Sequence, residues 1–284
     1  HQKVVEEAPS SFISPETRAA MGEQAVELAR VVGYRSAGTV EFIVGADQDF
    51  YFLEMNTRLQ VEHPVTEMVY GLDLVEKMIR IAAGEELGLT QDDIKADGWS
   101  VEARVYAEDP ARGFLPSIGQ LVRYREPEGE GVRVDSGVDE GGEISMYYDP
   151  MIAKLICWGE SREIALNRMN GYLTQTAFLG VNNNQEFLRN IITHNAFQGA
   201  DLHTHFVDQY HDTLLPKSYA QGDNAEAAIT ALYFAAGFER DDREEISDPW
   251  AICDNWRMNH DLKKLIRLRH NDDVIEARVE GSYD

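Results

Sequence analysis

The first part of the chain carries one clear amphipathic helix pattern. Apolar residues recur at helical spacing over residues 15–32, which predicts one buried helix face. Ser14 and Pro15 mark its start, because Ser is a favoured N-cap and Pro fits the first helical turn. Gly33 marks its end, since glycine readily adopts the left-handed conformation that follows many helices.

Two apolar segments separated by a polar turn come next. Residues 37–44 and 50–55 are typical of strands, and together they predict an antiparallel hairpin. The stretch FYFLEM begins almost continuously apolar, which predicts a strand buried on both faces. In such a hairpin we expect Glu41 to come close to Glu54 or Asn56.

Helix and strand patterns continue to the end of the chain. Helices are expected at 72–83, 161–176 and 183–194, and strands near 100–108, 119–125, 131–136 and 150–157. A shift to Pro, Gly and small polar residues over 213–225 predicts a linker. An Ala-rich helix at 226–238 and strands near 262–269 and 274–279 would follow. A lone hairpin is only marginally stable, so we expect this last part to be the truncated start of another domain.

A polar residue occupies every second position after the apolar start of FYFLEM. These residues are Glu54, Asn56, Arg58, Gln60 and Glu62. In an extended chain they would share one face of the strand. The solvated side of an ordinary strand shows the same pattern. Acids at the end of a buried strand need a partner, however, because burying an unpaired carboxylate is costly, and a bound cation would be one.

Composition and charge narrow the classes of partner. The 284 residues carry a formal net charge of −24, which makes nucleic acid or an anionic membrane surface a poor partner. No apolar run is long enough to span a bilayer. Cys157 and Cys253 lie far apart and indicate ordinary thiols in a reducing compartment. In so acidic a chain, an anionic ligand would need specific basic residues at its binding site, and Arg58 and Arg104 are candidates for that role.

The side chains of Glu41, Glu54 and Asn56 offer only oxygen ligands. Such ligands suit Mg²⁺ or Mn²⁺, which commonly bridge carboxylates and nucleotide phosphates. Zinc is disfavoured because the chain lacks a Cys/His cluster at the usual spacing. Two neighbouring acids alone are weak evidence, so the spacing leaves the metal site and a purely structural explanation open.

Five longer motifs, in a fixed order, carry a resemblance to a known family. They are HQKVVEEAP, GTVEFI, FLEMNTRLQVEHPVTE, EARVYAEDP and YYDPMIAKLICWG, and they resemble the biotin carboxylase component of biotin-dependent acyl-CoA carboxylases. The resemblance implies an α+β fold, with the C-terminal half of an ATP-grasp domain over 1–90 and a biotin carboxylase C-terminal domain over 91–212. After the linker at 213–225, residues 226–284 resemble, more weakly, the truncated start of a helix-plus-β-barrel domain that joins subunits.

The resemblance also implies a role for each matching residue. The metal ligands would be Glu41, Glu54 and Asn56. The nucleotide contacts would be His1, Gln2 and Ile43, and the bicarbonate contacts Lys3, Arg58, Gln60 and Val61. The catalytic group would be Glu62 as general base, with Arg58 and Arg104. Arg104 would stabilise the biotin enolate, and Asp149 would lie at the biotin end of the site.

The implied function is ATP-dependent carboxylation of biotin by bicarbonate through carboxyphosphate. The cofactors would be ATP, Mg²⁺ or Mn²⁺, and biotin attached to a carrier domain outside this chain. A carboxyltransferase β subunit would be the partner in a hetero-oligomer, in the cytoplasm or, in a eukaryote, the mitochondrial matrix. The family's Gly-rich phosphate loop is not found in the sequence, so we expect the isolated chain to be inactive.

Two further interpretations stay open at this point. The stretch GGEISMYYDPMIAKL is most similar to carboxylases of propionyl-CoA, and those of methylcrotonyl-CoA or acetyl-CoA are the alternatives. A non-catalytic scaffold with the same fold is the second alternative. It is disfavoured because every matching catalytic position keeps the expected residue type.

Overall fold

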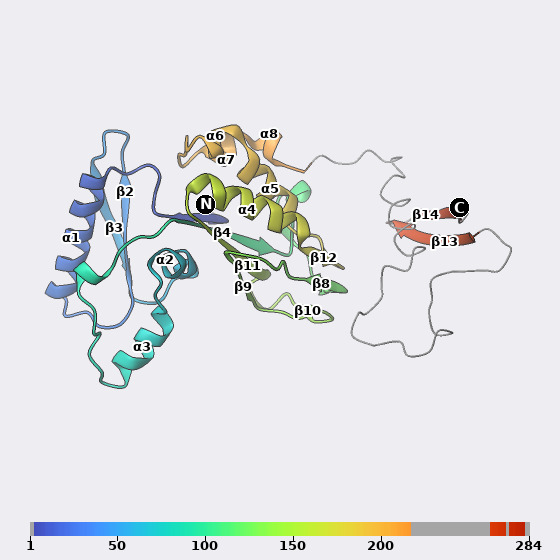
Figure 1. Ribbon diagram of the computed structural model, residues 1–284. Coiled ribbons are helices and arrows are strands. Elements are labelled where there is room, and N and C mark those ends of the chain that lie inside the picture. The colour runs from blue at the N-terminus through green and yellow to red at the C-terminus, as the bar shows by residue number, and fades with distance from the viewer. Residues whose placement is uncertain (1–2, 217–261, 271–272, 282–284) are drawn as a thin grey trace. The chain divides into compact units, whose positions relative to one another are not determined.

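The computed structural model describes residues 3–216, 262–270 and 273–281 (Figure 1). The chain divides into two compact units, His1–Pro216 and Lys217–Asp284. The helix predicted at 226–238 lies outside the described residues, as does most of the predicted linker.

The first unit contains twelve strands and eight α-helices among its described residues. The strands are β1 (Val5–Ala8), β2 (Thr39–Val44), β3 (Phe50–Asn56), β4 (Trp99–Tyr106), β5 (Glu108–Asp109), β6 (Leu115–Pro116), β7 (Gly119–Gln120), β8 (Arg123–Arg125), β9 (Val132–Ser136), β10 (Glu143–Ile144), β11 (Met151–Gly159) and β12 (Ala177–Leu179). The helices are α1 (Pro15–Val31), α2 (His63–Tyr70), α3 (Leu74–Ala82), α4 (Arg162–Gln175), α5 (Gln185–Thr193), α6 (Asn195–Gln198), α7 (Phe206–Gln209) and α8 (His211–Leu214). In the second unit β13 (Leu262–His270) and β14 (Asp273–Gly281) form an antiparallel hairpin.

A four-stranded antiparallel sheet is the centre of the first unit. Its strand order is β1-β4-β11-β9, so strands distant in sequence become neighbours. The strands predicted near 100–108, 131–136 and 150–157 are confirmed as β4, β9 and β11. The single strand predicted at 119–125 is wrong: β7 pairs with β10 and β8 pairs with β12, because the chain changes sheets between them.

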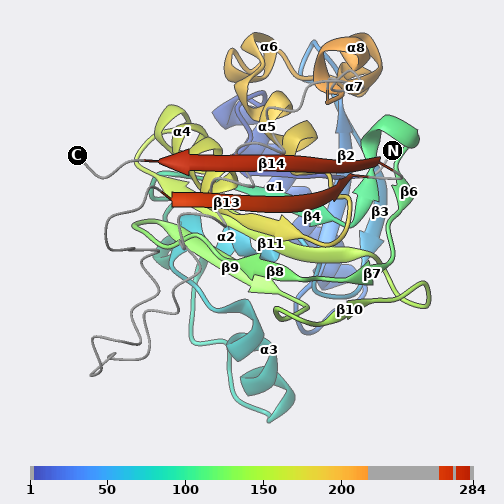
Figure 2. The ribbon, with the colours of Figure 1, turned by 90° about the vertical axis from the view of Figure 1, so that its right-hand side faces the viewer.

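The two faces of this sheet are chemically different. One face is apolar and packs against α4 and α5, with Leu155 of β11 and Met169 of α4 fully buried in the shared core. Helix α2 contacts β4, β1 and β11. Both views place α3 away from the sheet, at the opposite end from α6–α8 (Figures 1 and 2). The second face, beside α2, carries Arg104 of β4 and Lys154 of β11.

The α1 and hairpin predictions are largely confirmed. Ser14 caps α1 by accepting a hydrogen bond from the Thr17 backbone N–H at 3.1 Å, and Gly33 follows the helix at φ 62°. The expected burial of the FYFL segment on both faces is wrong, since Tyr51 and Leu53 are 63% and 56% exposed. The physical reason is that β2 and β3 form a separate two-stranded sheet, which the other described elements do not cover on both faces.

Two smaller findings concern the membrane and the thiols. Within the described ranges, the longest helices lack the length and hydropathy needed to cross a bilayer. Cys157 is buried and unpaired, and burial raises the pKa of its thiol. Cys253 lies outside the described residues.

The buried core predicts a large stability difference between two Leu→Ala substitutions. Leu155→Ala removes a side chain with 0% exposure and leaves a cavity between the sheet and α4. It should lower the free energy of unfolding by about 2–5 kcal/mol. Leu179→Ala, at a position with 57% exposure, is the matched control and should cost less than about 0.5 kcal/mol. Denaturant unfolding of both variants measures the difference, and equal losses would contradict this account of the core.

Candidate active site

Two acidic side chains face each other across the β2–β3 hairpin. Glu41 is directly opposite Glu54 in the antiparallel register, and Leu53 then forms a bulge beside the pair. The Asn56 side-chain amide donates a hydrogen bond to Glu41 Oε1 at 2.8 Å, so all three groups share one surface. Like charges directly opposite in a sheet are unfavourable. A cation held by both carboxylates would offset that repulsion.

The segment after β3 does not continue as a strand. The prediction of one extended polar face from Glu54 to Glu62 is wrong, because β3 ends at Asn56 and α2 begins at His63. The chain turns between them, and Pro64 in the first turn of α2 favours that helix start. Sequence periodicity missed α2, since its eight residues are too few to display a helical repeat clearly.

The turn nevertheless brings the predicted polar residues together. The Gln60 side-chain amide donates to Glu41 Oε1 at 2.9 Å, so residue 60 returns to the hairpin acids. Arg58 is exposed, and its guanidinium donates only to the Leu59 carbonyl, at 3.3 Å, among the described groups. Its remaining N–H groups are therefore available to a ligand.

Glu62 is held by two cations from distant parts of the chain. Lys3 Nζ lies 2.9 Å from Glu62 Oε1, and Arg104 Nη2 lies 2.8 Å from Glu62 Oε2. Lys3 also lies 3.4 Å from Glu41 Oε1 and so connects the hairpin acids to Glu62. Arg104 itself is buried on β4, and its Nη2 lies 2.5 Å from Glu6 Oε1.

These contacts keep the site acids ionised. Burial opposes ionisation of Glu62, but its hydrogen bonds, above all from Lys3, and the charges of Lys3 and Arg104 hold its pKa below the ordinary value. The Gln60 hydrogen bond is the main reason that the pKa of Glu41 is also lowered, and Lys3 adds to it. Both carboxylates therefore carry negative charge near neutral pH.

The sheet face beneath these residues carries both acidic and basic side chains on neighbouring strands. Arg104, Lys154 and Asp135 lie in one row across β4, β11 and β9, because Lys154 is directly opposite both others. Glu6 is directly opposite Glu102 on the neighbouring strands β1 and β4. We call this set, together with Arg133, the charged face; its members are Glu6, Glu102, Arg104, Arg133, Asp135 and Lys154.

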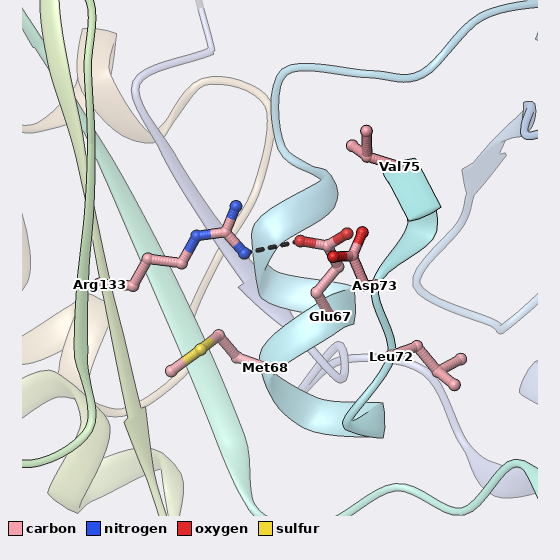
Figure 3. Close-up of a pocket in the computed structure, with 6 residues that line it drawn as sticks. All are labelled: Glu67, Met68, Leu72, Asp73, Val75 and Arg133. Atoms are coloured by element: carbon pink, nitrogen blue, oxygen red, sulfur yellow. Dashed lines mark hydrogen bonds and ion pairs between the residues drawn. The ribbon is translucent and has the colours of Figure 1, made fainter. Parts of the chain in front are cut away.

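The charged face reaches the turn and α2 through specific contacts. Lys154 Nζ donates to the Val61 carbonyl at 2.8 Å and pairs with Asp135 at 3.2 Å. Arg133 Nη1 lies 2.6 Å from Glu67 Oε2 on α2. The pair lies beside a cavity of about 400 Å³ that Met68, Leu72, Asp73 and Val75 also line. Figure 3 shows these lining residues.

Sequence reasoning identified Arg104 but missed the other members of the charged face. The signal was present, since VEARVY, VRVDS and MIAKLIC each alternate apolar residues with one or two charges. Such alternation usually marks a solvated strand face. Here α2 covers that face, so Glu102 is 0% and Lys154 7% exposed.

Several predicted residues are not joined to this cluster. Asp149 is exposed and accepts a hydrogen bond from the Met151 backbone N–H at 2.9 Å, as a turn residue before β11. Ile43 is exposed on the hairpin, 49% by area. His1 and Gln2 lie outside the described residues, so their nucleotide contacts stay predictions.

The hairpin acids fit a hard divalent cation. Their donors are carboxylate and amide oxygens, and Glu54 is exposed without an ion pair inside the described part of the chain. No group of three or more His, Cys, Asp or Glu within residues 3–216 and the β13–β14 hairpin forms a closed cage. A cation at Glu41 and Glu54 would therefore take further ligands from water or phosphate oxygens, as Mg²⁺ does.

Two domain families account for most of the first unit. Residues 1–90 match the carbamoyl-phosphate synthase L chain, ATP binding domain, and residues 102–209 match the biotin carboxylase C-terminal domain. An ATP-binding region followed by this C-terminal domain defines the class. The chain belongs to the biotin carboxylase family.

Curated relatives agree with this family. The propionyl-CoA carboxylase alpha chain of Ruegeria pomeroyi is 56% identical over 84% of this chain and 39% of its own length. The mitochondrial propionyl-CoA carboxylase alpha chain of Homo sapiens is 48% identical over 99% of this chain and 40% of its own length. The mitochondrial methylcrotonoyl-CoA carboxylase subunit alpha of Dictyostelium discoideum is 41% identical over 99% of this chain and 40% of its own length. The chain thus spans about two fifths of these relatives.

Solved structures share the fold. The biotin carboxylase domain of a thermophilic 2-oxoglutarate carboxylase, bound to bicarbonate, is 45% identical with a TM-score of 0.74 over 78% of this chain and 49% of that one. The biotin carboxylase domain of the Hydrogenobacter thermophilus 2-oxoglutarate carboxylase, in complex with MgADP and bicarbonate, is 44% identical. Its TM-score is 0.75, and the match covers 77% of this chain and 48% of that one.

The Glu6–Glu102 pair predicts a pH-dependent stability. Burial raises the pKa of Glu102 to about 8; the positive charge of Lys154 opposes this rise, and the negative charge of Glu6 adds to it. Burial also raises the pKa of Glu6, to about 7. The folded state therefore holds a proton that the unfolded chain has released, and stability falls as pH rises from the ordinary value of 4.5 through this range.

Glu102→Gln imitates the protonated carboxyl group, so the variant should not lose stability through this residue as the pH rises. The melting temperature of the variant minus that of the parent protein should therefore increase between about pH 5 and about pH 8. Differential scanning calorimetry at both pH values measures it, with the lower pH as the internal control. A difference that stays constant or shrinks would show that Glu102 is ionised in the fold.

Proposed function

We propose that the full-length protein containing this chain carboxylates biotin with bicarbonate, using ATP. The observation that supports this most strongly is the Glu62 carboxylate between Lys3 and Arg104, at 2.9 and 2.8 Å, beside the hairpin acids. A base, an anion-binding cation and oxygen ligands then lie on one continuous surface. The bicarbonate and MgADP bound by structural relatives fit the same chemistry.

Bicarbonate would bind at the turn before α2. Lys3 and Arg58 supply positive charge, and a guanidinium can hold a planar carboxylate-like anion through two parallel hydrogen bonds. Gln60 and the Val61 backbone N–H supply further donors. A net charge of −24 would otherwise repel this anion, which makes the local cations necessary.

Glu62 would act as the general base. Its pKa lies below the ordinary value, so the carboxylate is in the protonation state that a base requires. An anion bound at Lys3 places a like charge beside Glu62, and this raises the carboxylate pKa as the ligand arrives. Glu62 then removes the bicarbonate proton, and the bicarbonate oxygen attacks the γ-phosphate of ATP to give carboxyphosphate and ADP.

The second half of the reaction would use Arg104. Carboxyphosphate decomposes to CO₂ and phosphate, and the phosphate removes the proton of the biotin ureido nitrogen. Arg104 would stabilise the negative charge on the biotin oxygen, as an oxyanion-hole donor does. Asp149 is proposed only to lie near the entrance used by biotin, since it does not contact Arg104 in the described structure.

The metal would be Mg²⁺ or Mn²⁺, held by Glu41, Glu54 and Asn56. When bound, it would neutralise charge on the ATP phosphates during transfer. His1, Gln2 and Ile43 are proposed to contact the nucleotide. Lys3 already neutralises part of the Glu41 charge at 3.4 Å, so this chain's own residues order the carboxylate before a metal arrives.

The domain assignment and assembly are also proposals. We assign residues 1–90 to the ATP-grasp half-domain, 91–212 to the C-terminal domain, 213–225 to a linker and 226–284 to the start of a subunit-joining domain. The β13–β14 hairpin is compatible with that start. The partners would be a biotin carrier domain and a carboxyltransferase β subunit, with propionyl-CoA as the acyl acceptor because the Ruegeria relative has 56% identity and the Dictyostelium methylcrotonoyl-CoA relative 41%.

The metal proposal predicts a specific binding defect. Glu54→Gln in the full-length protein keeps the side-chain shape but removes one of the two opposed charges, so nucleotide-dependent Mn²⁺ binding should weaken by about tenfold or more. Glu186→Gln, at an exposed position on α5, is the control and should bind Mn²⁺ like the parent. Electron paramagnetic resonance titration measures free Mn²⁺. Unchanged binding by Glu54→Gln would remove Glu54 from the metal site.

The base proposal predicts a separation of two rates. Glu62→Gln cannot accept a proton, so bicarbonate-dependent ATP cleavage should fall by about 10²–10⁴-fold while ATP binding is retained. Arg104→Ala should reduce biotin carboxylation more than it reduces ATP cleavage, because Arg104 acts on the later step. Glu163→Gln, on the exposed side of α4, serves as the control. Retention by Glu62→Gln of more than about a tenth of the parent rate would exclude Glu62 as the base.

A further inference from the structure

Lys154 is a buried cation that the proposed reaction does not use. It lies in the middle of β11 and is only 7% exposed. Burying an ammonium group is costly unless it is paired and hydrogen-bonded. Its Nζ has two such partners, the Val61 carbonyl oxygen at 2.8 Å and Asp135 Oδ2 at 3.2 Å. The first of these is unusual, because it ties a sheet residue to the backbone of the candidate site.

The strand register places Lys154 beside the residue that holds Glu62. Lys154 is directly opposite Arg104 in the β4–β11 pairing. Arg104 binds the Glu62 carboxylate, and Lys154 binds the carbonyl of the peptide that joins Val61 to Glu62. Because a peptide unit is planar, holding that carbonyl also fixes the direction of the Glu62 backbone N–H. Adjacent strands therefore hold the backbone and the side chain of the same residue.

A second set of contacts keeps Lys154 in place. Arg133 binds both oxygens of Asp135, at 2.7 and 3.0 Å, and reaches Glu67 on α2 at 2.6 Å. Glu67 in turn accepts the Leu74 backbone N–H at 2.6 Å, where α3 begins. Figure 3 shows the Arg133 guanidinium directed at the Glu67 carboxylate. Helix α2 is thus held to the sheet by the contact of Arg133 with Glu67 in the helix and by that of Lys154 with the Val61 carbonyl just before it.

From this geometry we infer that Lys154 is a positioning residue for bicarbonate activation, acting through the Val61–Glu62 peptide. The inference rests on the proposed function of Glu62. Lys154 itself touches no reacting group. It sets the orientation of the base and of the Val61 backbone, and a misplacement of about 1 Å at a reacting group is enough to cost about 10²-fold in rate.

The test compares Lys154→Met with a matched substitution in the full-length protein. Methionine keeps an unbranched side chain but cannot hydrogen-bond the Val61 carbonyl, and Asp135 still has Arg133. Arg162→Met is the control, because Arg162 is also a partly buried cation that bridges the two matched regions, through Glu7 at 2.7 Å, yet does not contact the candidate site. Melting temperature, MgATP affinity, and kcat and KM for bicarbonate in ATP cleavage are measured for both.

Lys154→Met should lower kcat/KM for bicarbonate by about 10–100-fold while MgATP affinity changes less than about twofold. Arg162→Met should change kcat/KM by less than about threefold, even if its melting temperature falls as much. Lys154→Arg, which can still donate to the carbonyl, should recover most of the loss. If Lys154→Met does not fold, Lys154→Gln keeps a donor without the charge and should show a smaller defect of about 3–10-fold.

The outcomes separate this inference from the function on which it rests. If the parent protein shows no bicarbonate-dependent ATP cleavage, the proposed function is wrong. If the parent is active and folded Lys154→Met, or Lys154→Gln in its place, keeps the parent kcat/KM, Lys154 has no positioning role. An equal loss in Arg162→Met, or a matching loss of MgATP affinity, would likewise overturn the inference, because it would indicate general destabilisation.

Discussion

The Arg104 guanidinium, between the carboxylates of Glu6 and Glu62, is the interaction on which the site depends. It joins β4 of the C-terminal region to β1 and to the turn before α2, at 2.5 and 2.8 Å. Buried charges are stable only when their desolvation is offset by good pairing, and removal of one partner typically costs about 3–5 kcal/mol. Arg104 can therefore stay buried beneath α2 because it contacts acids on both β1 and the turn.

A few basic residues at the candidate site explain how an acidic chain could bind an anion. The chain carries a net charge of −24, yet Lys3 and Arg104 both contact Glu62, and Arg58 is exposed in the same turn before α2. Glu6, Glu41 and Glu62 are each contacted by a Lys or Arg side chain, and Glu41 also accepts hydrogen bonds from amide groups. Electrostatic complementarity is thus produced locally, by strand register and turn geometry, against an overall charge that repels anions.

Much of the site could be predicted from sequence because its strands have period two. The opposition of Glu41 and Glu54, with Asn56 beside them, follows from strand pairing alone. The continuation of that face to Glu62 was wrong because β3 ends at Asn56 and the chain turns before α2, although polar residues keep their period-two spacing through the turn. Burial of Glu102 and Lys154 could not be predicted, since α2, which covers them, lies more than thirty residues away from Glu102 in sequence. The apolar FYFL segment likewise indicated burial that the described residues do not provide.

The geometry also connects the two matched regions of the chain. Basic residues of the C-terminal region, Arg104, Arg133, Lys154 and Arg162, each contact an acid or a carbonyl in the first ninety residues. Those of Arg104 and Lys154 lie at the turn that carries Arg58, Gln60 and Glu62. A rigid connection of this kind would keep the base and the anion contacts in one arrangement while substrates arrive.

The most direct test of this account is a crystal structure of the full-length protein with MgADP and bicarbonate. The account predicts that the anion contacts Lys3, Arg58 and Gln60, within hydrogen-bonding distance of Glu62. It also predicts that Arg104 keeps its ion pair with Glu6 and that Lys154 keeps its hydrogen bond to the Val61 carbonyl. Bicarbonate bound away from Lys3 and Glu62, or a Val61 carbonyl released from Lys154 in the complex, would contradict it.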